Sequence, residues 1–334
     1  MRGARLLCLR RAEEQLQHSS ALAVLLACPL DGTSLSDMDG KLVCEQKHEF
    51  QTVDGVPVFT EQPRREYEPQ NMPSCAVRES EEIDPFVSNW IVNTNGNLYW
   101  KVRGNLPRYP VPRWPFDKGN GKIVVDLGCG WGRWCLAAAD AGFSPVGVDV
   151  HLDAVQAATR VAKQNEKGIR YLCADIERLP FRRESVDRIF SYSVLQHLDR
   201  EKVARILGEA FRVLKPGGDV GIQLPNSRGL LSMFQQLRRG FREARRGTFE
   251  MRYWSSRQIQ ELFTNSGFQG TKLSADGFFS QNPQLNDLDL LSVAGKCIVL
   301  TSYAGSALSR TLRPLVAVAD SLWVTARKPE SKAS

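Results

Sequence analysis

The stretch VVDLGCGWGRW, residues 124–134, decides the fold of this 334-residue chain. It begins with an apolar run that contains one carboxylate, Asp126, and leads into the alanine-rich, helix-favouring run 133–141. Three glycines alternate between these two runs: Gly128, Gly130 and Gly132. Because glycine has no side chain to obstruct a tight turn, a ligand can approach the backbone there. A buried strand, a glycine turn and a helix predict the first unit of a doubly wound α/β domain.

The same alternation of strand and helix continues along the chain. Short apolar runs predict strands, and apolar residues spaced near 3.6 predict amphipathic helices. The predicted strands are 123–127, 145–150, 169–173, 186–191 and 219–224, and the predicted helices are 133–141, 152–165, 201–214 and 255–266. This order implies a parallel sheet with helices on both faces.

Two acidic residues follow predicted strands at the edge where α/β sheets bind ligands. Asp149 ends the second strand, and its carboxylate can accept hydrogen bonds from both hydroxyls of an adenosine ribose. Asp175 follows the third strand and can accept from an adenine amino group, while the neighbouring backbone at Ile176 donates to the ring. Four further residues belong to this predicted cofactor site: Cys129, Arg133, Val150 and Ser191.

A nicotinamide dinucleotide is the alternative ligand, and two features oppose it. The spacing is G-x-G-x-G, whereas the dinucleotide fingerprint is G-x-G-x-x-G. Asp126, expected at the mouth of the turn, would repel a pyrophosphate and attract an ammonium group. S-adenosylmethionine carries an ammonium and a sulfonium and no phosphate, so the electrostatics favour it.

Residues 120–225 resemble the class I S-adenosylmethionine-dependent methyltransferases, and in particular the type-11 domain of quinone-biosynthesis-like enzymes. The matching stretches are VVDLGCGWGRW, VGVDV, CADIERLPF, DRIFSYSVLQHL and RVLKPGG. The resemblance implies a Rossmann-like sheet of seven strands, mostly parallel, whose last strand runs antiparallel. Residues 321–327 resemble that last strand and residues near 268–275 its partner, which makes 284–320 an insertion.

Methyl transfer from a sulfonium is an in-line displacement, so positioning does most of the work, and a hydroxyl acceptor must also lose a proton. His197 is the candidate base, with a packing or helix-capping role as the alternative. Tyr192, Tyr253 and Trp254 are candidates for the acceptor pocket, although core packing accounts equally well for the last two. A polar-aromatic stretch is a candidate lid over the cofactor, with a simple turn as the alternative: Asn93, Asn95, Asn97, Tyr99 and Trp100.

The amino-terminal part carries a metal-ligand pattern. Cys28 and Asp31 form C-x2-D, and Cys44 and His48 form C-x3-H. This resembles the zinc ribbon of certain ribosomal-RNA guanine methyltransferases, in which a second cysteine stands where this chain has Asp31. Aspartate can ligate zinc, but a thiolate binds it more strongly. A zinc site and a ribbon without metal therefore both remain open. Three Asp-Gly pairs predict chain reversals in this β-rich module, at 31–32, 39–40 and 54–55.

These patterns divide the chain into six parts. They are an amino-terminal segment 1–24, a zinc-ribbon-like module 25–60, a linker 61–85, a lid or substrate segment 86–119, a cofactor-binding core 120–225, and acceptor-binding insertions with the last strands at 226–330. In the segment 86–119, the prolines at 107, 110, 112 and 115 argue against a long helix.

Composition indicates the cellular compartment and bears on the class of methyl acceptor. The eight cysteines are scattered, which indicates a reduced, cytoplasmic protein, and no apolar run is long enough to span a membrane. The net charge is +7, with its densest cluster at residues 238–246. A small-molecule acceptor (a lipid, quinone, glycan or secondary metabolite) is the first hypothesis. An RNA base gripped by the ribbon and the arginines is the second, and a non-catalytic cofactor-binding regulator is the third. No pattern indicates an oligomeric state.

Overall fold

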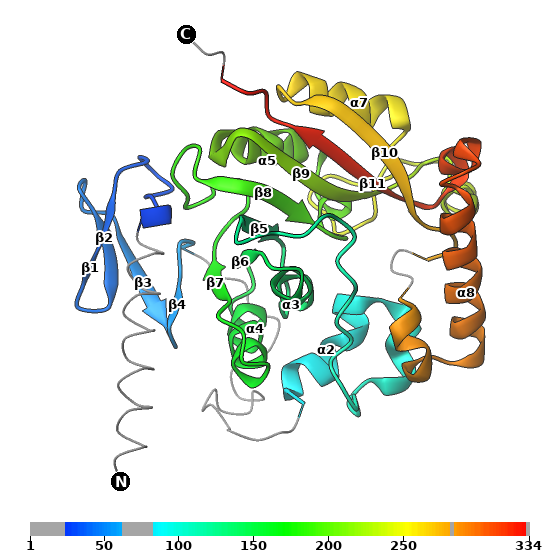
Figure 1. Cartoon of the computed structure of the whole chain (residues 1–334), viewed down its shortest axis with the longest axis horizontal. Helices are drawn as coiled ribbons and strands as arrows, with labels where there is room; N and C mark the ends of the chain where they lie inside the picture. Colours follow the sequence, from blue (N-terminus) through cyan, green and yellow to red (C-terminus); the bar gives the residue numbers. More distant parts are fainter. Residues whose placement is uncertain (1–23, 62–82, 281–283, 332–334) are drawn as a thin grey trace.

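The computed structural model describes residues 24–61, 83–280 and 284–331 (Figure 1). Nearly all of the expected amino-terminal segment 1–24 and most of the expected linker 61–85 lie outside these residues. The boundaries of the other expected parts stay predictions, although several coincide with element ends reported below.

A seven-stranded sheet forms the centre of the molecule, in the order β10-β11-β9-β8-β5-β6-β7. The strands are β5 (Ile123–Leu127), β6 (Ser144–Asp149), β7 (Arg170–Cys173), β8 (Val186–Ser191), β9 (Leu214–Pro225), β10 (Gln269–Gly277) and β11 (Ser321–Arg327). Strands β5 to β9 pair in parallel, and β11 runs antiparallel to both β9 and β10. The expected Rossmann-like sheet with an antiparallel last strand is confirmed.

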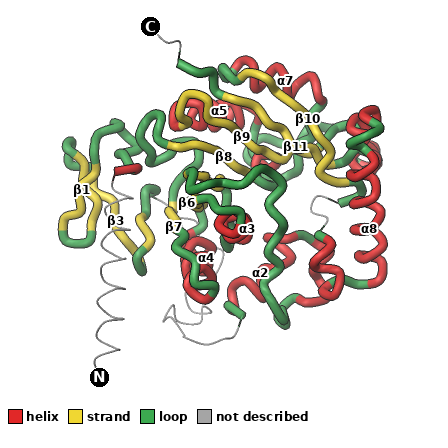
Figure 2. The backbone as a smooth tube through the Cα atoms, viewed as in Figure 1, coloured by secondary structure: helices red, strands yellow, loops and turns green. Residues whose placement is uncertain are grey.

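Helices cover both faces of this sheet (Figures 1 and 2). They include α3 (Arg133–Asp140), α4 (Leu152–Gln164), α5 (Arg200–Val213) and α7 (Ser256–Asn265). In Figure 1, α3 and α4 lie below the sheet and α5 and α7 lie above it. The central strands are almost fully buried, as parallel strands between two helical layers must be.

One strand is longer than its sequence pattern predicts. The predicted strand 219–224 is β9, which already starts at Leu214 and includes the Pro-Gly-Gly stretch 216–218. Leu214 pairs with Val186 of β8, and a register shift follows before the regular ladder resumes. Helix α5 ends at Val213, so Pro216, Gly217 and Gly218 lie inside a strand and not at the end of the helix.

The amino-terminal module is a separate antiparallel sheet of four short strands: β1 (Leu35–Met38), β2 (Lys41–Cys44), β3 (Glu49–Val53) and β4 (Val56–Pro57). Asp39-Gly40 and Asp54-Gly55 connect β1 to β2 and β3 to β4, and all four residues have positive φ. Two-residue hairpin turns of this type require positive φ at both positions, which is why Asp-Gly is favoured there. At the third predicted pair, Asp31-Gly32, the chain also reverses, because the Gly32 N–H donates to the Cys28 carbonyl at 2.8 Å, so all three predicted reversals are confirmed.

This module is packed onto the outer edge of the large sheet at β7, on the left in Figure 1. The backbone N–H of Phe59 donates to the carbonyl of Cys173 at 2.7 Å, and the N–H of Ala27 donates to the carbonyl of Pro180 at 3.1 Å. The side chains of Leu26 and Phe59 are buried in the same apolar cluster as the central strands. The module is therefore continuous with the core of the larger domain.

The remaining elements surround the carboxyl ends of the strands. They are α2 (Pro85–Asn95), the 3-10 helix η2 (Asn97–Val102), the 3-10 helix η3 (Leu195–His197), α6 (Leu230–Arg238), the 3-10 helix η4 (Leu285–Leu290), α8 (Val293–Leu308) and the 3-10 helix η5 (Arg313–Val318). Helix α2 begins where Asp84 accepts from the Phe86 N–H at 3.0 Å, with Pro85 in the first turn. The four prolines counted against a helix all lie beyond η2. Among the described residues, no helix has the length and apolar character needed to cross a bilayer.

Candidate functional site

The glycine turn is shaped by close neighbours that leave no room for side chains. Gly128 has a φ of +74°, and a Cβ there would lie 2.4 Å from Cγ2 of Val194. Gly132 has a φ of +82°, and a Cβ there would lie 2.3 Å from the hydroxyl of Tyr171. The N–H of Gly130, between them, donates to Oδ2 of Asp149 at 2.9 Å. The turn is therefore tied to the end of the neighbouring strand β6.

A cavity of about 280 Å³ opens beside this turn at the carboxyl ends of the parallel strands. Ten of the residues expected to form the cofactor, catalytic and acceptor sites line it: Gly128, Cys129, Gly130, Arg133, Asp149, Val150, Asp175, Ile176, Tyr192 and His197. These residues come from four different strand ends, so the fold brings together what the sequence separates.

Asp126 lies elsewhere, which differs from the expectation that it stands at the mouth of the turn. Its side chain is 3% exposed, does not line the cavity, and accepts from the Cys135 thiol at 3.4 Å. Burial raises the pKa of this carboxyl to about 7. Successive side chains of a strand alternate between the two faces of the sheet. The Asp126 side chain lies on the face covered by α3, where it contacts Cys135, and not at the edge of the sheet that faces the cavity. The negative charge at the cavity comes from other residues.

Four other expected residues also lie outside the cavity wall: Gly132, Ser191, Tyr253 and Trp254. Ser191 is fully buried and its hydroxyl donates to the carbonyl of Leu127 at 2.9 Å. The Tyr253 hydroxyl is bonded to Gln235, and the Trp254 ring packs under the guanidinium of Arg200 at 4.4 Å. Tyr253 and Trp254 therefore have the surroundings expected of packing residues, which was the alternative to a place in the acceptor pocket.

Asp149 and Asp175 present carboxylates to the cavity. Oδ1 of Asp149 accepts from the backbone N–H of His151 at 3.0 Å, while Oδ2 accepts from Gly130. Asp175 is exposed, and its Oδ1 accepts from the N–H of Glu177 at 2.9 Å. A carboxylate oxygen has two lone pairs, so both side chains keep acceptor capacity for a ligand after making these bonds.

His197 is held in one orientation at the cavity wall. Its ring stacks on Phe249 with centroids 4.1 Å apart, and Nδ1 lies 3.1 Å from the Phe249 carbonyl. Since a carbonyl can only accept, Nδ1 carries the proton and Nε2 is the basic nitrogen. Burial lowers the pKa of His197 below its usual 6.5, so the ring is neutral at physiological pH. Phe249, 72% exposed, was not expected at the site because nothing in its local sequence distinguishes it.

Helix α2 forms part of the opposite wall. Phe86, Trp90, Asn93 and Thr94 line the cavity, of which only Asn93 was among the expected lid residues. Three of the other expected lid residues do not line the cavity: two of them form hydrogen bonds to other residues, and the third is mostly exposed. Asn95 accepts from the Trp131 indole at 3.1 Å, the Tyr99 hydroxyl donates to Asp287 at 2.5 Å, and Trp100 is 69% exposed.

Arg133 is buried between the cavity and a polar cluster behind it. Its guanidinium lies 5.8 Å from the Trp134 ring centroid and 5.7 Å from that of Tyr192. The Tyr192 hydroxyl donates to Oδ2 of Asp276 at 2.7 Å. Burial raises the pKa of Asp276 to about 6. Asp276 is far from the glycine motif in the sequence, and no local pattern marks it.

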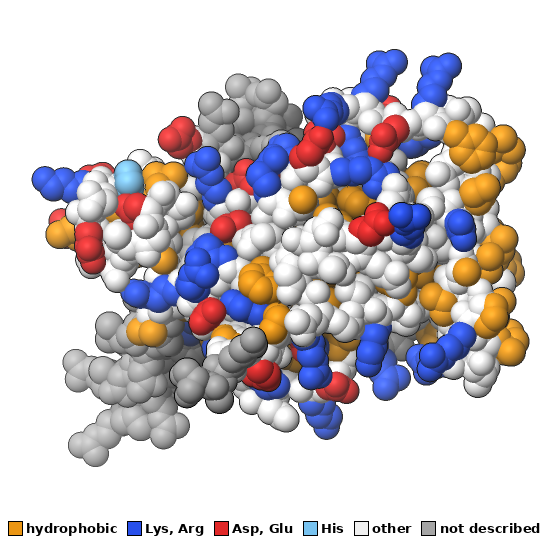
Figure 3. Space-filling view, turned by 90° about the horizontal axis from the view of Figure 1, so that it is seen from above, with side chains coloured by type: hydrophobic (Ala, Val, Ile, Leu, Met, Phe, Trp, Pro, Cys, Tyr) orange, Lys and Arg blue, Asp and Glu red, His pale blue; other side chains and the backbone are white. Residues whose placement is uncertain are grey.

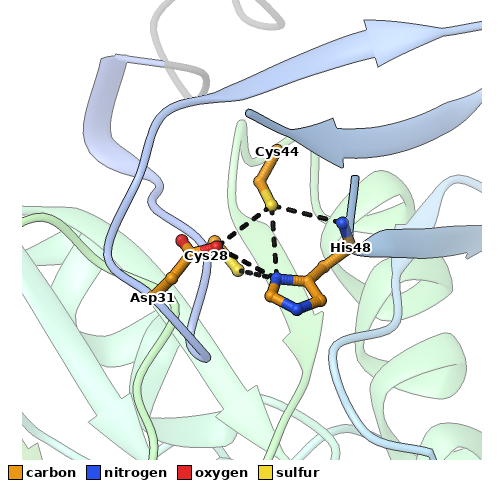
Figure 4. A group of neighbouring side chains, drawn as sticks. All are labelled: Cys28, Asp31, Cys44 and His48. Carbon is orange, nitrogen blue, oxygen red and sulfur yellow. Dashed lines mark hydrogen bonds and ion pairs between the residues drawn. The ribbon is translucent and has the colours of Figure 1, made fainter. Parts of the chain in front are cut away.

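The four residues of the metal-ligand pattern converge in the amino-terminal module (Figure 4). Their ligand atoms all lie within 4.8 Å of one another. Nδ1 of His48 is 3.0 Å from Oδ2 of Asp31, 3.3 Å from Sγ of Cys44 and 3.5 Å from Sγ of Cys28. Oδ2 of Asp31 is 3.3 Å from Sγ of Cys44. A hairpin between β2 and β3 places Cys44 and His48 together through the His48 carbonyl, which accepts from the Cys44 N–H.

The arginine cluster lies at the end of α6 and in the loop after it. Its members are Arg238, Arg239, Arg242, Arg245 and Arg246. Arg246 pairs with Glu201 at 2.5 Å, and both side chains are more than half exposed. Glu243 lies within the cluster, and Glu250, which follows it, accepts from the Arg245 N–H at 3.0 Å. These contacts are those of a solvated, partly neutralised surface.

Comparison with known proteins shows what part of this chain is similar to. Residues 124–218 match the family described as methyltransferase domain. Phosphoethanolamine N-methyltransferase 1 of Triticum aestivum is 34% identical over 113 residues, 31% of this chain and 21% of that protein. Ubiquinone biosynthesis O-methyltransferase of Coxiella burnetii is 34% identical over 98 residues, 29% of this chain and 41% of that protein. The matches thus span less than half of these relatives.

Among solved structures, phosphoethanolamine N-methyltransferase 2 of Haemonchus contortus, in complex with S-adenosyl-L-methionine, superposes with a TM-score of 0.44. Its sequence identity is 18%, and the superposition covers 73% of this chain and 56% of that one. The family match covers 95 of the 334 residues, so this part of the chain is similar to a methyltransferase domain. The matched region coincides with the strands and helices that build the cavity, from β5 to the start of β9.

Proposed function

We propose that this protein transfers the methyl group of S-adenosylmethionine to a small-molecule acceptor. The observation that carries the proposal is the cavity itself, in which the glycine turn, Asp149 and Asp175 meet at one edge of the sheet. The relatives' names support the class of acceptor, since they include an N-methyltransferase of phosphoethanolamine and an O-methyltransferase of ubiquinone biosynthesis. The type-11 subgroup stays a prediction.

The residues at the cavity suit this donor. Gly130, with only Thr94 within 4 Å of where its Cβ would be, leaves the backbone open to a ligand. Asp149 would hold the ribose hydroxyls, and Asp175 with the Ile176 backbone would hold the adenine. When bound, S-adenosylmethionine supplies an electrophilic methyl group on a sulfonium. The aromatic wall from α2 keeps water away from that charge.

His197 is proposed as the general base for a hydroxyl or amine acceptor. In its neutral ring Nε2 is the basic nitrogen, and it lies 3.4 Å from the amide nitrogen of Gln196, a long contact that the acceptor would displace. The hydrogen bond from Nδ1 to the Phe249 carbonyl would stabilise the ring as Nε2 accepts the acceptor's proton. As the acceptor atom bonds to the methyl carbon, the carbon–sulfur bond breaks and the neutral thioether leaves. A packing role would leave turnover insensitive to the imidazole.

Calorimetry of the full chain with S-adenosylhomocysteine tests the donor. We expect binding to wild type, and binding weaker by about tenfold or more in Asp149→Asn, because two hydroxyl contacts lose a charged acceptor. Asp140→Asn is the matched control, since that carboxylate pairs with Lys167 away from the cavity. No affinity for S-adenosylhomocysteine together with tight binding of a nicotinamide dinucleotide would refute the proposal.

A labelled-donor screen of extracted metabolites and of total RNA tests the acceptor. We expect label in a small-molecule fraction, with little dependence on salt. Label in RNA, with binding that weakens steeply between low and moderate ionic strength, would instead support the RNA alternative. Donor binding without any labelled product in either fraction would favour the non-catalytic regulator.

We also propose that the amino-terminal cluster binds zinc. A tetrahedral zinc ion with bonds of about 2.3 Å to sulfur and about 2.0–2.1 Å to nitrogen and oxygen places its ligand atoms roughly 3.3–3.8 Å apart. The three separations that involve sulfur are 3.3, 3.3 and 3.5 Å and fall in this range, and the nitrogen–oxygen separation is shorter, at 3.0 Å. Two cysteine sulfurs, a carboxylate oxygen and an imidazole nitrogen converge within 4.8 Å, so one cation at their centre could accept a lone pair from each of the four.

Metal analysis of the purified full chain tests this site. We expect about one zinc per chain in wild type and a large loss in Cys44→Ser. Cys297→Ser is the control, because Cys297 is an exposed thiol on α8. Zinc far below one per chain in wild type, or equal zinc in both variants, would refute the assignment and leave the ribbon without metal.

A further inference from the structure

A second and larger hollow lies on the other side of Trp134 from the donor cavity. It is a groove of about 1090 Å³ between strands β10 and β11, the helix α8, and the extended segment 113–116. Trp134 belongs to the wall of both hollows. Tyr192 lines the donor cavity, and its hydroxyl donates to Asp276, which lines the groove. One layer of side chains therefore separates the two spaces.

The groove is rimmed by positive charge. Four of its lining residues are cationic: Arg113, Lys272, Arg310 and Arg313. Within the described part of the chain, none of the four forms an ion pair, whereas nearby Arg108 pairs with both Asp287 and Asp289. Asp276 is the single carboxylate among the described lining residues, and its Oδ2 already accepts from Tyr192 and Ser321. The unbalanced charge at the rim favours an anion.

The floor of the groove is aromatic. The rings of Phe116 and Trp323 lie 5.2 Å apart, and those of Trp134 and Trp323 lie 6.1 Å apart. Apolar side chains also continue outside the groove, where Leu308 and Leu312 are 49% and 52% exposed at the end of α8. Figure 3 shows hydrophobic side chains gathered at this end of the molecule. Such surfaces bind the apolar part of a ligand.

We infer that this groove binds the methyl acceptor and that the acceptor is an amphiphilic organic anion, with a phosphate or carboxylate group beside a hydrocarbon or aromatic portion. The inference rests on the proposed function for its methyl-transfer role. The anionic group contacts the arginines and Lys272 at the rim, and the apolar portion lies on the tryptophans. Because Trp134 and Tyr192 separate the groove from the donor cavity, these side chains must move aside for the methyl group to pass to the acceptor.

Binding of simple probes to the full chain tests the groove without turnover. Octyl phosphate and octanoate are the anionic probes, and octyltrimethylammonium is the cationic probe of similar length. We expect an anionic probe to bind, the cationic probe not to bind, and the double variant Arg310→Ala/Arg313→Ala to bind the anion about tenfold more weakly or worse. Tighter binding of octyl phosphate would identify the anionic group as a phosphate, and tighter binding of octanoate would identify it as a carboxylate.

A charge-matched control separates this site from general attraction. Arg238→Ala/Arg242→Ala removes the same charge from the surface after α6 and should leave the affinity unchanged. Ala307→Trp fills the groove from α8 and should abolish binding of the probe while leaving S-adenosylhomocysteine affinity intact. Circular dichroism and the thermal midpoint verify that each variant folds.

The two proposals fail in different ways. Equal binding of the anion to wild type and to both double variants, or equal binding of the cationic probe, would overturn the groove assignment while donor binding stands. Anion binding in the groove without any affinity for S-adenosylhomocysteine would overturn the methyl-transfer function and leave an anion-binding groove. Octyl phosphate or octanoate that competes with the acceptor in labelled methyl transfer by wild type, together with loss of transfer but not of S-adenosylhomocysteine affinity in Ala307→Trp, would support both.

Discussion

Replacing Gly128 with alanine tests whether the glycine turn is required by both its backbone and its neighbour. The backbone there has a φ of +74°, and the new Cβ would lie 2.4 and 2.8 Å from the two methyl groups of Val194 and 3.1 Å from its Cβ. Because the Val194 Cβ is also close, rotation of that side chain cannot relieve the overlap. The left-handed conformation costs about 1–2 kcal/mol, and overpacking adds about 1–3 kcal/mol. We expect Gly128→Ala to lower the free energy of unfolding by about 2–5 kcal/mol.

Two comparison variants divide this cost into its parts. Gly121 has a φ of +78° and no atom within 4 Å of an added Cβ, so Gly121→Ala should lose only about 1–2 kcal/mol. Adding Val194→Ala to Gly128→Ala removes both overlapping methyl groups, so the double variant should regain the stability lost to overpacking but not the stability lost to the left-handed backbone. Urea denaturation gives the free energy of unfolding of each single variant and of the double variant. The difference between the double-variant loss and the sum of the two single losses is the free energy of the overlap.

Donor binding distinguishes the turn's role in the site from its role in stability. We expect Gly128→Ala to weaken S-adenosylhomocysteine by about tenfold or more, since the turn forms the cavity wall, and Gly121→Ala to leave the affinity unchanged. If Gly128→Ala unfolds at the same urea concentration as Gly121→Ala and binds the donor like wild type, the steric argument is wrong.

Three further predictions concern single side chains. His197→Ala should lose turnover with the acceptor found in the screen but keep donor affinity; in wild type, kcat should fall only when the pH drops below 6.5, because burial lowers the His197 pKa, and an unchanged rate in the variant would exclude the base. Asp31→Cys should hold zinc more tightly in competition with a coloured chelator, because a thiolate replaces a carboxylate; weaker retention would contradict the proposed ligand set. Asp276→Asn should change how stability depends on pH. The folded pKa of about 6 exceeds the usual 3.8, so wild type loses about 3 kcal/mol as the pH rises from 4 through 6, and the same slope in both proteins would refute this.

The sequence predicted the sheet because its signals are local. Each strand is a short apolar run and each helix has its own period, so strand order followed from a resemblance carried by five contiguous motifs. The antiparallel partners β10 and β11 also lay where that resemblance placed them. The four metal-ligand residues were predicted from their spacing and its resemblance to a zinc ribbon, and they converge in the structure.

The remaining parts of the site depend on contacts that no local pattern encodes. Asp126 was expected to face the ligand because it precedes the glycine turn, but the strand's alternation sends its side chain to Cys135. Phe249 reaches His197 from a loop 52 residues away. The groove is formed by the segment 113–116 together with β10, β11 and α8. Its cationic residues are far apart in the sequence, so no local pattern predicts that they lie together.

The seam between the amino-terminal module and β7 has a practical consequence for truncation. Module residues bond to Cys173 on one side of the Asp175 loop and to Pro180 on the other, so they clamp the loop expected to contact adenine. A fragment that starts at residue 120 would lose that clamp and expose the backbone of an edge strand, which invites other chains to add to the sheet. Such a fragment should aggregate and bind nucleoside poorly even though every motif of the methyltransferase domain is present.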